Sequence, residues 1–168
     1  MKLLITGASS TLASQLAVLL LESGKFSLRL LEHRSVARIE SCETVFGNLN
    51  DPESLDRACI GMDGVLHLAA LTHSCNDAEY FKVNREGTRN LINACKKNDA
   101  RRFFFVSSVA ASGNGGAYGL SKLEAEELVC KSGLEWNILR PAEVYGPEMK
   151  EGIGKLISWV ESLQFIPI

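Results

Sequence analysis

The sequence lacks the features that would assign a protein to a specialised class. Its longest uninterrupted apolar run extends only from Leu16 to Leu21, far short of the ~20 residues that a membrane-spanning helix needs. Lys and Arg number 18 against 20 Asp and Glu, so there is no basic excess that would attract nucleic acid or an anionic membrane. We therefore expect no nucleic-acid partner and no membrane association.

Cysteine and histidine are sparse as well. The five cysteines are widely spaced without a Cys-x-x-Cys pair, and there are only three histidines. This pattern predicts neither a disulfide framework nor a metal site. It is typical of a cytoplasmic protein whose thiols are reduced and mostly buried.

The overall composition is that of an ordinary globular protein. Hydrophobic residues make up 46% of the 168 residues and charged residues 23%, which excludes intrinsic disorder. The length suits one domain with its own core. The apolar start of the chain, Met1 to Ile5, is interrupted at Thr6-Gly7 before it could form a signal peptide.

Short apolar runs alternate with amphipathic stretches along the chain. The predicted strands are residues 2–6, 26–32, 44–46, 65–69, 102–107 and 136–140. The predicted helices are residues 12–23, 51–61, 77–97 and 118–131, with a final helical stretch at 153–163. Strands that alternate with helices indicate an α/β protein with a doubly wound, Rossmann-like parallel sheet of about six strands.

A turn rich in small residues follows the first predicted strand. It runs from Thr6 to Ala13, with small side chains at Gly7, Ser10 and Ala13. A tight glycine turn at a helix N-terminus presents backbone N–H groups and the positive end of the helix dipole to a pyrophosphate. Only the first of the three positions is glycine, and an ordinary strand-to-helix turn remains the alternative.

The end of the second predicted strand carries two opposite signals. Glu32 stands where an acid accepts hydrogen bonds from both hydroxyls of an adenosine ribose, which favours NAD over NADP. Arg34 would instead favour a 2′-phosphate, and two solvated charges after a strand are the third reading.

Tyr118 and Lys122 are four residues apart at the start of a predicted helix, so both project from one face. A neighbouring ammonium favours the phenolate form and brings a tyrosine toward the working range of a proton-transfer group. Ser107 and Ser108 end the preceding strand. Because ligands of open α/β sheets bind at the carboxyl ends of strands, a serine hydroxyl and the phenol could meet at one substrate atom.

Together these motifs resemble the extended branch of the short-chain dehydrogenase/reductase superfamily, the NAD-dependent epimerase/dehydratase family. The resemblance covers the cofactor-binding lobe. The matching segments are Thr6-Gly7-Ala8, Val65 to Ala70, Asn84 to Leu91, Val106-Ser107-Ser108, Tyr118 to Lys122, and Leu139-Arg140-Pro141 leading to Val144-Tyr145-Gly146-Pro147.

The resemblance implies roles for individual residues. Tyr118 would transfer the proton, Lys122 would assist it and bind the ribose, and Ser108 would orient the substrate. Asn84 would help to fix the geometry of the active site. The implied cofactor-binding residues are Gly7, Ser10, Thr11, Leu12, Glu32, Arg34, Asn48, Leu49, Leu68, Ala69, Ala70, Asn84, Ser107, Tyr118, Lys122, Pro141 and Val144.

The sequence departs from the family pattern at several points. Ser10 replaces the second glycine of the phosphate turn and adds a side chain where backbone approaches pyrophosphate. Asn48 stands where the family often has an aspartate, and Ser112 stands where a Val-Tyr-Gly run is common. From the resemblance we also expect the C-terminal substrate lobe to be missing or truncated.

We expect residues 1–150 to form the NAD(P)-binding domain and residues 151–168 to begin a truncated substrate lobe. The apolar side chains in this last segment, such as Ile157 and Trp159, would favour self-association, so a homo-oligomer is expected. Among the remaining candidates, we expect His67 to be a core histidine, His73 to lie in a loop near the site, and Phe103 to Phe105 to be core strand.

The resemblance implies an NAD-dependent epimerase/dehydratase-type oxidoreductase that acts on a nucleotide sugar. Hydride would pass to nicotinamide while Tyr118 acts as acid and base. Two alternatives stay open: a non-catalytic NAD(P)-binding regulator and an inactive fragment.

Overall fold

A computed structural model describes residues 1–33, 39, 41–142 and 144 of the chain. In this part a six-stranded sheet has the order β3-β2-β1-β4-β5-β6, and every neighbouring pair is parallel. The strands are β1 (Lys2–Thr6), β2 (Ser27–Glu32), β3 (Glu43–Phe46), β4 (Gly64–His67), β5 (Arg102–Val106) and β6 (Glu135–Leu139). The predicted doubly wound sheet is confirmed.

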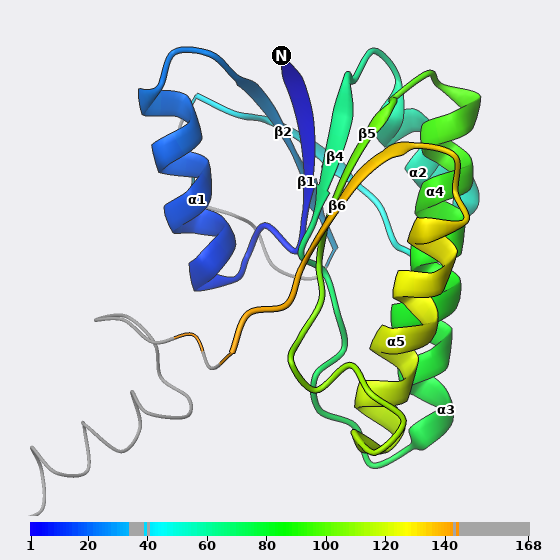
Figure 1. Cartoon of the computed structure of the whole chain (residues 1–168). Coiled ribbons are helices and arrows are strands. Elements are labelled where there is room, and N and C mark those ends of the chain that lie inside the picture. Colours follow the sequence, from blue (N-terminus) through cyan, green and yellow to red (C-terminus); the bar gives the residue numbers. More distant parts are fainter. Residues whose placement is uncertain (34–38, 40, 143, 145–168) are drawn as a thin grey trace, which may run out of the picture.

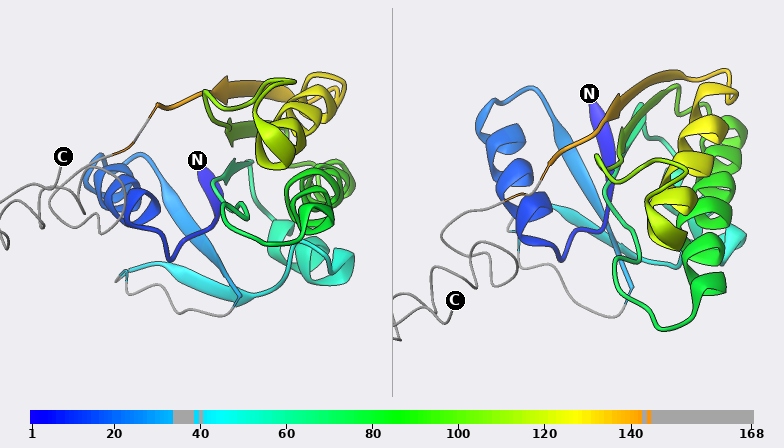
Figure 2. Two further views of the ribbon diagram at one scale, coloured as in Figure 1. Left: turned by 90° about the horizontal axis from the view of Figure 1, so that it is seen from below. Right: turned by 60° about the horizontal axis from the view of Figure 1, so that its bottom comes forward.

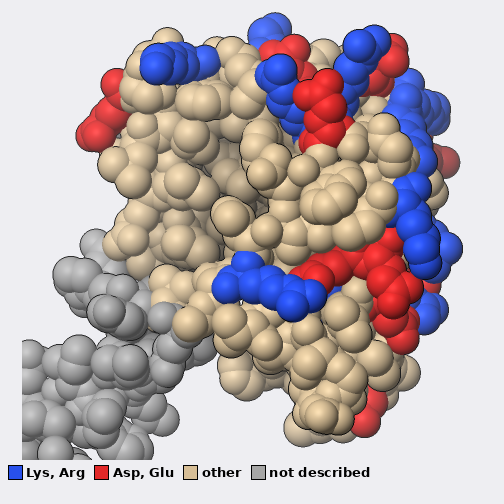
Figure 3. Space-filling model, viewed as in Figure 1, with Lys and Arg blue, Asp and Glu red and all other residues tan. Residues whose placement is uncertain are grey.

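Helices cover the two faces of the sheet (Figures 1 and 2). Helix α1 (Thr11–Glu22) lies on one face. The opposite face carries α2 (Pro52–Cys59), α4 (Gly87–Lys97) and α5 (Gly116–Cys130), and α3 (Asp77–Tyr80) joins α4 through a π-helical segment, η1 (Phe81–Glu86). Charged side chains gather over the α4–α5 side in Figure 3, whereas few lie over α1.

Two apolar clusters hold the helices against the sheet. Alternate residues of β1 serve the two faces: Leu3 and Ile5 pack with the buried alanines of α1, whereas Leu4 packs with the cluster under α2, α4 and α5. This second cluster contains the fully buried side chains of Leu91 and Phe103. The core therefore forms on both faces, as expected when helices sandwich a parallel sheet.

The predicted elements agree with the observed ones to within a few residues, with two differences. Strand β4 ends at His67 rather than Ala69, because the chain leaves the sheet and the Ala69 N–H donates instead to the Thr6 hydroxyl, 3.2 Å away. The expected single helix 77–97 is interrupted by the π-helical turn. Such turns insert an extra residue into a helix and are frequent at functional sites.

The expectation of mostly buried thiols is wrong. Cys59 and Cys95 are buried, Cys42 is intermediate, and Cys75 and Cys130 are exposed; all five are unpaired. Cys75 lies in the loop before α3 and Cys130 is the last residue of α5, so neither is placed where it would pack into the core.

Several expectations fall on residues outside those described. They concern the helix at 153–163, the truncated lobe at 151–168 and self-association through that segment. Within the described ranges, no helix is long and apolar enough to span a bilayer, and no group of three or more metal-binding side chains lies together.

A buried polar link joins β1, β4 and α4. His67 is fully buried and is within 2.6 Å of the Thr6 hydroxyl and 3.0 Å of the Thr88 hydroxyl. Its ring stacks on Phe105 with 5.4 Å between ring centroids. Burial, reinforced by the Lys122 charge, lowers the pKa of His67 to about 3, so the expected core histidine is confirmed and is neutral at pH 7.

This depressed pKa predicts a pH-dependent stability. The folded state keeps His67 neutral down to pH about 3, whereas the unfolded chain takes up a proton near pH 6.5. The free energy of unfolding should therefore fall by up to about 1.4 kcal/mol per pH unit as the pH drops below 6.5. Urea titrations between neutral and mildly acidic pH measure this slope. His67→Gln should flatten it and the exposed His73→Gln should not; equal slopes in both variants would contradict the assignment.

Candidate functional site

Two cavities lie at the carboxyl ends of the strands and share part of their lining. The first has a volume of about 630 Å³ and the second of about 560 Å³. Ser9, Ser10, Leu68 and Ala70 line both. The two cavities are therefore halves of one groove that crosses the sheet edge where the strand order reverses between β1 and β4, which is the usual ligand position in open α/β sheets.

The turn after β1 forms the middle of this groove. Gly7 has a φ of +73°, and a Cβ added there would lie 2.6 Å from the Ala69 backbone nitrogen. Glycine is thus required both by the backbone conformation and by the close approach of the segment after β4. The turn closes with a 3.0 Å hydrogen bond from Ser10 N–H to the Gly7 carbonyl and leads directly into α1.

Ser10 is the N-cap of α1. Its hydroxyl accepts a hydrogen bond from the Ala13 N–H at 3.2 Å. This contact explains why serine suits the position where a second glycine was expected, because a capping hydroxyl satisfies one of the unpaired amides of the first helical turn. Thr11 and Leu12, whose amides belong to the same turn, line the second cavity. The positive end of the helix dipole therefore faces the groove.

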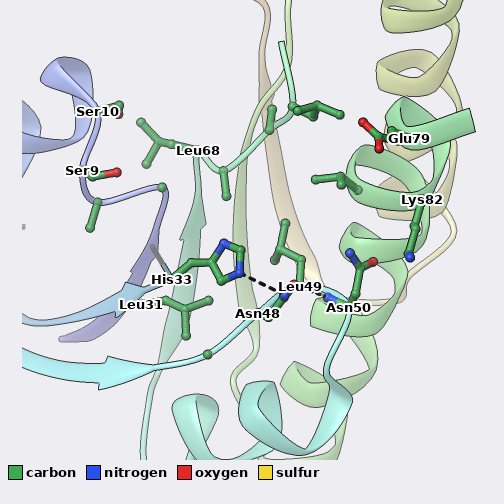
Figure 4. Close-up of a pocket in the computed structure, with 17 residues that line it drawn as sticks. Ser9, Ser10, Leu31, His33, Asn48, Leu49, Asn50, Leu68, Glu79 and Lys82 are labelled. Carbon is green, nitrogen blue, oxygen red and sulfur yellow. Dashed lines mark hydrogen bonds between the residues drawn. The ribbon is translucent and has the colours of Figure 1, made fainter. Parts of the chain in front are cut away.

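The first cavity lies beyond β2 and is shown in Figure 4. His33 directly follows β2, and its Nε2 is 3.1 Å from Nδ2 of Asn48. Leu49 lines the wall and is itself buried. Glu79 and Lys82, from the helical segments after β4, complete the lining on the far side.

The second cavity holds the predicted catalytic residues. Ser108, Tyr118 and Lys122 all line it. The Lys122 side chain is almost fully buried, and its ammonium donates to the Val106 carbonyl at 2.8 Å and lies 4.2 Å from the centroid of the Phe105 ring. Tyr118 is half-buried and meets Tyr80 edge to face, with 5.9 Å between centroids.

The position of the Lys122 ammonium affects its charge. Burial lowers the pKa of Lys122 to about 8, although the Glu126 carboxylate acts in the opposite direction. Lys122 lines the same cavity as the Tyr118 phenol and the Ser108 hydroxyl. The arrangement can therefore hold a proton acceptor, a cation and the Ser108 hydroxyl around one ligand atom.

Asn84 stands behind the wall of the groove and not in it. Its side chain bonds both backbone polar groups of Leu71, at 2.8 Å to the N–H and 3.0 Å to the carbonyl, and donates to the Ser121 hydroxyl at 3.0 Å. The π-helical turn carries this side chain inward. Asn84 thus links the loop after β4 to α5 by hydrogen bonds, and this link fixes the position of one side of the groove relative to the other.

The structure brings most of the predicted site residues into the groove. Those that line it are Gly7, Ser10, Thr11, Leu12, Asn48, Leu49, Leu68, Ala69, Ala70, Ser107, Ser108, Tyr118, Lys122, Pro141 and Val144. Glu32 and Asn84 line neither cavity; the Glu32 side chain is only 4% exposed. Arg34 lies outside the described residues.

The lining also contains residues that the sequence did not predict, and His33, Glu79 and Lys82 are those with ionisable side chains. His33 could have been found, because it directly follows the strand end that carries Glu32. Glu79 and Lys82 belong to a segment that reads as one regular helix, so no pattern in the sequence separates them from solvent-facing residues.

Comparison with known proteins gives concordant results. A family model described as the NAD dependent epimerase/dehydratase family matches residues 3–163. The UDP-glucose 4-epimerase of Vibrio cholerae is 27% identical, over 94% of this chain and 56% of its own length. The ceramide reductase of Caulobacter vibrioides is 32% identical, over 89% of this chain and 48% of its own length.

Solved structures agree on the fold. The Bordetella bronchiseptica enzyme WbmH, crystallised in complex with NAD+, superposes with a TM-score of 0.83 at 22% identity, covering 96% of this chain and 62% of WbmH. The chain spans about half the length of the curated relatives it matches.

The close approach at Gly7 predicts a specific cost. Gly7→Ala should lower the free energy of unfolding more than Gly24→Ala, as measured by urea titration. Both glycines have similar positive φ values, +73° and +66°, so both variants bear a strain of roughly 1–2 kcal/mol. Only the Gly7 variant also drives a methyl group into the Ala69 backbone, since nothing lies within 4 Å of the corresponding atom at Gly24. Equal losses would show that the two segments are not held in contact.

Proposed function

The chain belongs to the NAD-dependent epimerase/dehydratase family, and from that premise we propose that it is the cofactor-binding part of an NAD-dependent enzyme acting on a nucleotide sugar. One observation carries the proposal. A single groove joins the phosphate turn and the N-terminus of α1 to a cavity that contains Ser108, Tyr118 and Lys122.

The residues of the groove suit a dinucleotide. The amides at the start of α1 and the dipole of that helix suit a pyrophosphate at the centre. The first cavity, with Leu49, Asn48 and His33, offers apolar and polar contacts for an adenosine. The second cavity would then receive the nicotinamide beside Tyr118 and Lys122. Nicotinamide, when bound, supplies the acceptor and donor of a hydride.

The chain's own residues handle the proton. The Tyr118 oxygen accepts the proton of a substrate hydroxyl as that carbon is oxidised, and returns it when a hydride is restored. The Lys122 ammonium stabilises the phenolate, because an opposite charge favours the ionised form. Ser108 holds the reacting oxygen: its hydroxyl accepts the Ala110 N–H at 3.1 Å, which leaves its own proton for the substrate.

Relatives support the substrate class. The Vibrio cholerae relative is named for UDP-glucose, and oxidation of a sugar hydroxyl is the step that epimerisation and dehydration share. A regulator that only bound the dinucleotide would not need a buried ammonium beside a phenol, because burial of a charge is costly. The site therefore favours an enzyme over a sensor.

The groove predicts a preference between cofactors. NAD+ should bind more tightly than NADP+, by roughly tenfold or more. A 2′-phosphate near His33 would be repelled by the carboxylate of Glu32, the preceding residue, which is buried behind the wall of the first cavity. Isothermal titration calorimetry with both nucleotides measures the difference, and Glu32→Gln should narrow it. Tighter binding of NADP+ would mean that a cation such as Arg34 or Lys82 recognises the phosphate.

The proposed proton-transfer role of Tyr118 predicts how turnover changes when its phenolic oxygen is removed. In the active enzyme, Tyr118→Phe should lower kcat by roughly 10²–10⁴, the usual contribution of a positioned acid–base group. Binding of NAD+ should change little, because the ring remains. Steady-state assays and calorimetry give the two quantities.

Tyr80→Phe is the matched control for this variant. It also removes a phenolic oxygen, but that oxygen bonds the Ser74 backbone and its ring contacts Tyr118 from the side. Turnover in this control should stay within a few-fold of wild type. If the two variants lost the same activity, Tyr118 would have no special part in the chemistry.

A further inference from the structure

Glu126 and Arg140 form an ion pair at the back of the second cavity. Glu126 lies one turn after Lys122 on α5, and its side chain is only 8% exposed. Both of its oxygens accept from Arg140, at 2.8 Å to Nε and 2.5 Å to Nη2. Arg140 directly follows β6 and precedes Pro141, which lines the cavity.

The location of this carboxylate calls for an explanation. A bidentate pair is the strongest geometry that arginine offers, but burial of a carboxylate is costly and the pair does not have to be buried for stability. Burial by itself would raise the pKa of Glu126. The hydrogen bonds and charge of Arg140 outweigh burial and, together with the Lys122 charge, hold that pKa below its ordinary value. Glu126 is therefore an anion at neutral pH.

The groups around Lys122 come from four elements. From β4, His67 is neutral; from β5, the Phe105 ring and the Val106 carbonyl contact the ammonium. From α5 come Tyr118 and Glu126, and directly after β6 comes the Arg140 cation that pairs with Glu126. Of these groups, Glu126 is the one that opposes the effect of burial on Lys122.

We propose that Glu126, held by Arg140, is a positioning residue that keeps Lys122 charged beside Tyr118. The neutral contacts from β5 fix where the ammonium lies, and the carboxylate keeps it protonated there. Its value for catalysis rests on the proposed function, whereas the electrostatic effect is a property of this chain alone. A residue that only braced β6 against α5 would leave the titration of Lys122 unchanged.

The test is an NMR titration of the Lys122 side chain in the chain without nucleotide or substrate. The Cε and Hε resonances are followed through neutral and alkaline pH and assigned by their loss in Lys122→Met. In Glu126→Gln, the midpoint of Lys122 should fall by on the order of one pH unit. Glu126→Asp, which retains a carboxylate, should restore most of the shift. Because no cofactor is used, a failure of the proposed enzyme activity would not affect this result.

Glu124→Gln is the matched control. It removes another arginine partner from α5, since Glu124 pairs with Arg85 at 2.8 Å, but it should leave the Lys122 midpoint unchanged. If the Lys122 midpoint in Glu126→Gln equalled that of wild type, the proposal would be overturned, and Glu126 would have only a structural role in joining β6 to α5. If Glu126→Gln does not fold, Glu126→Met decides, because it replaces the carboxylate with an apolar side chain of similar length. The Lys122 midpoint should again fall, and an unchanged or higher midpoint would overturn the proposal.

Discussion

The groove depends on one close backbone contact, between the turn after β1 and the segment after β4. Gly7 approaches Leu68 and Ala69 so closely that no Cβ fits between them. The neighbouring side chains secure the contact, because the Thr6 hydroxyl bonds both the Ala69 N–H and the His67 ring. Since β1 and β4 flank the point where the strand order reverses, this contact brings the start of α1 and the two cavities together.

A second requirement is the burial of a cation at the end of β5. Lys122 is enclosed by a helix and a strand whose other side chains are mostly apolar. The Val106 carbonyl, the Phe105 ring and Glu126 compensate in part for the lost hydration of its ammonium. Burial therefore still lowers the pKa of Lys122 to about 8. Functional sites are where such shifts of pKa toward the working pH are commonly found. The same interactions stiffen the junction of β5, α5 and β6, so stability and chemistry depend on shared contacts.

Most of the fold could be predicted from the sequence because its signals are local. Apolar runs bounded by glycine, proline and capping residues mark strands and helices, and the β-α alternation itself requires parallel pairing. The π-helical turn could not be predicted, because residues 77–97 read as one regular helix. It depends on Asn84 reaching Leu71 and Ser121, and contacts between separate segments leave no periodic trace in the chain.

The sequence by itself determined the residues of the phosphate turn, the Tyr118–Lys122 pair and the family to which these motifs belong, because their spacing along a turn or one helix face sets their geometry. Only the tertiary structure decided how they are used. In the folded protein His33, rather than Glu32, lines the groove. The Ser10 hydroxyl caps α1. Glu126 pairs with Arg140 one helical turn from Lys122. Burial and charge pairing arise when distant segments pack together, and no local pattern of residues encodes which neighbour a side chain will meet.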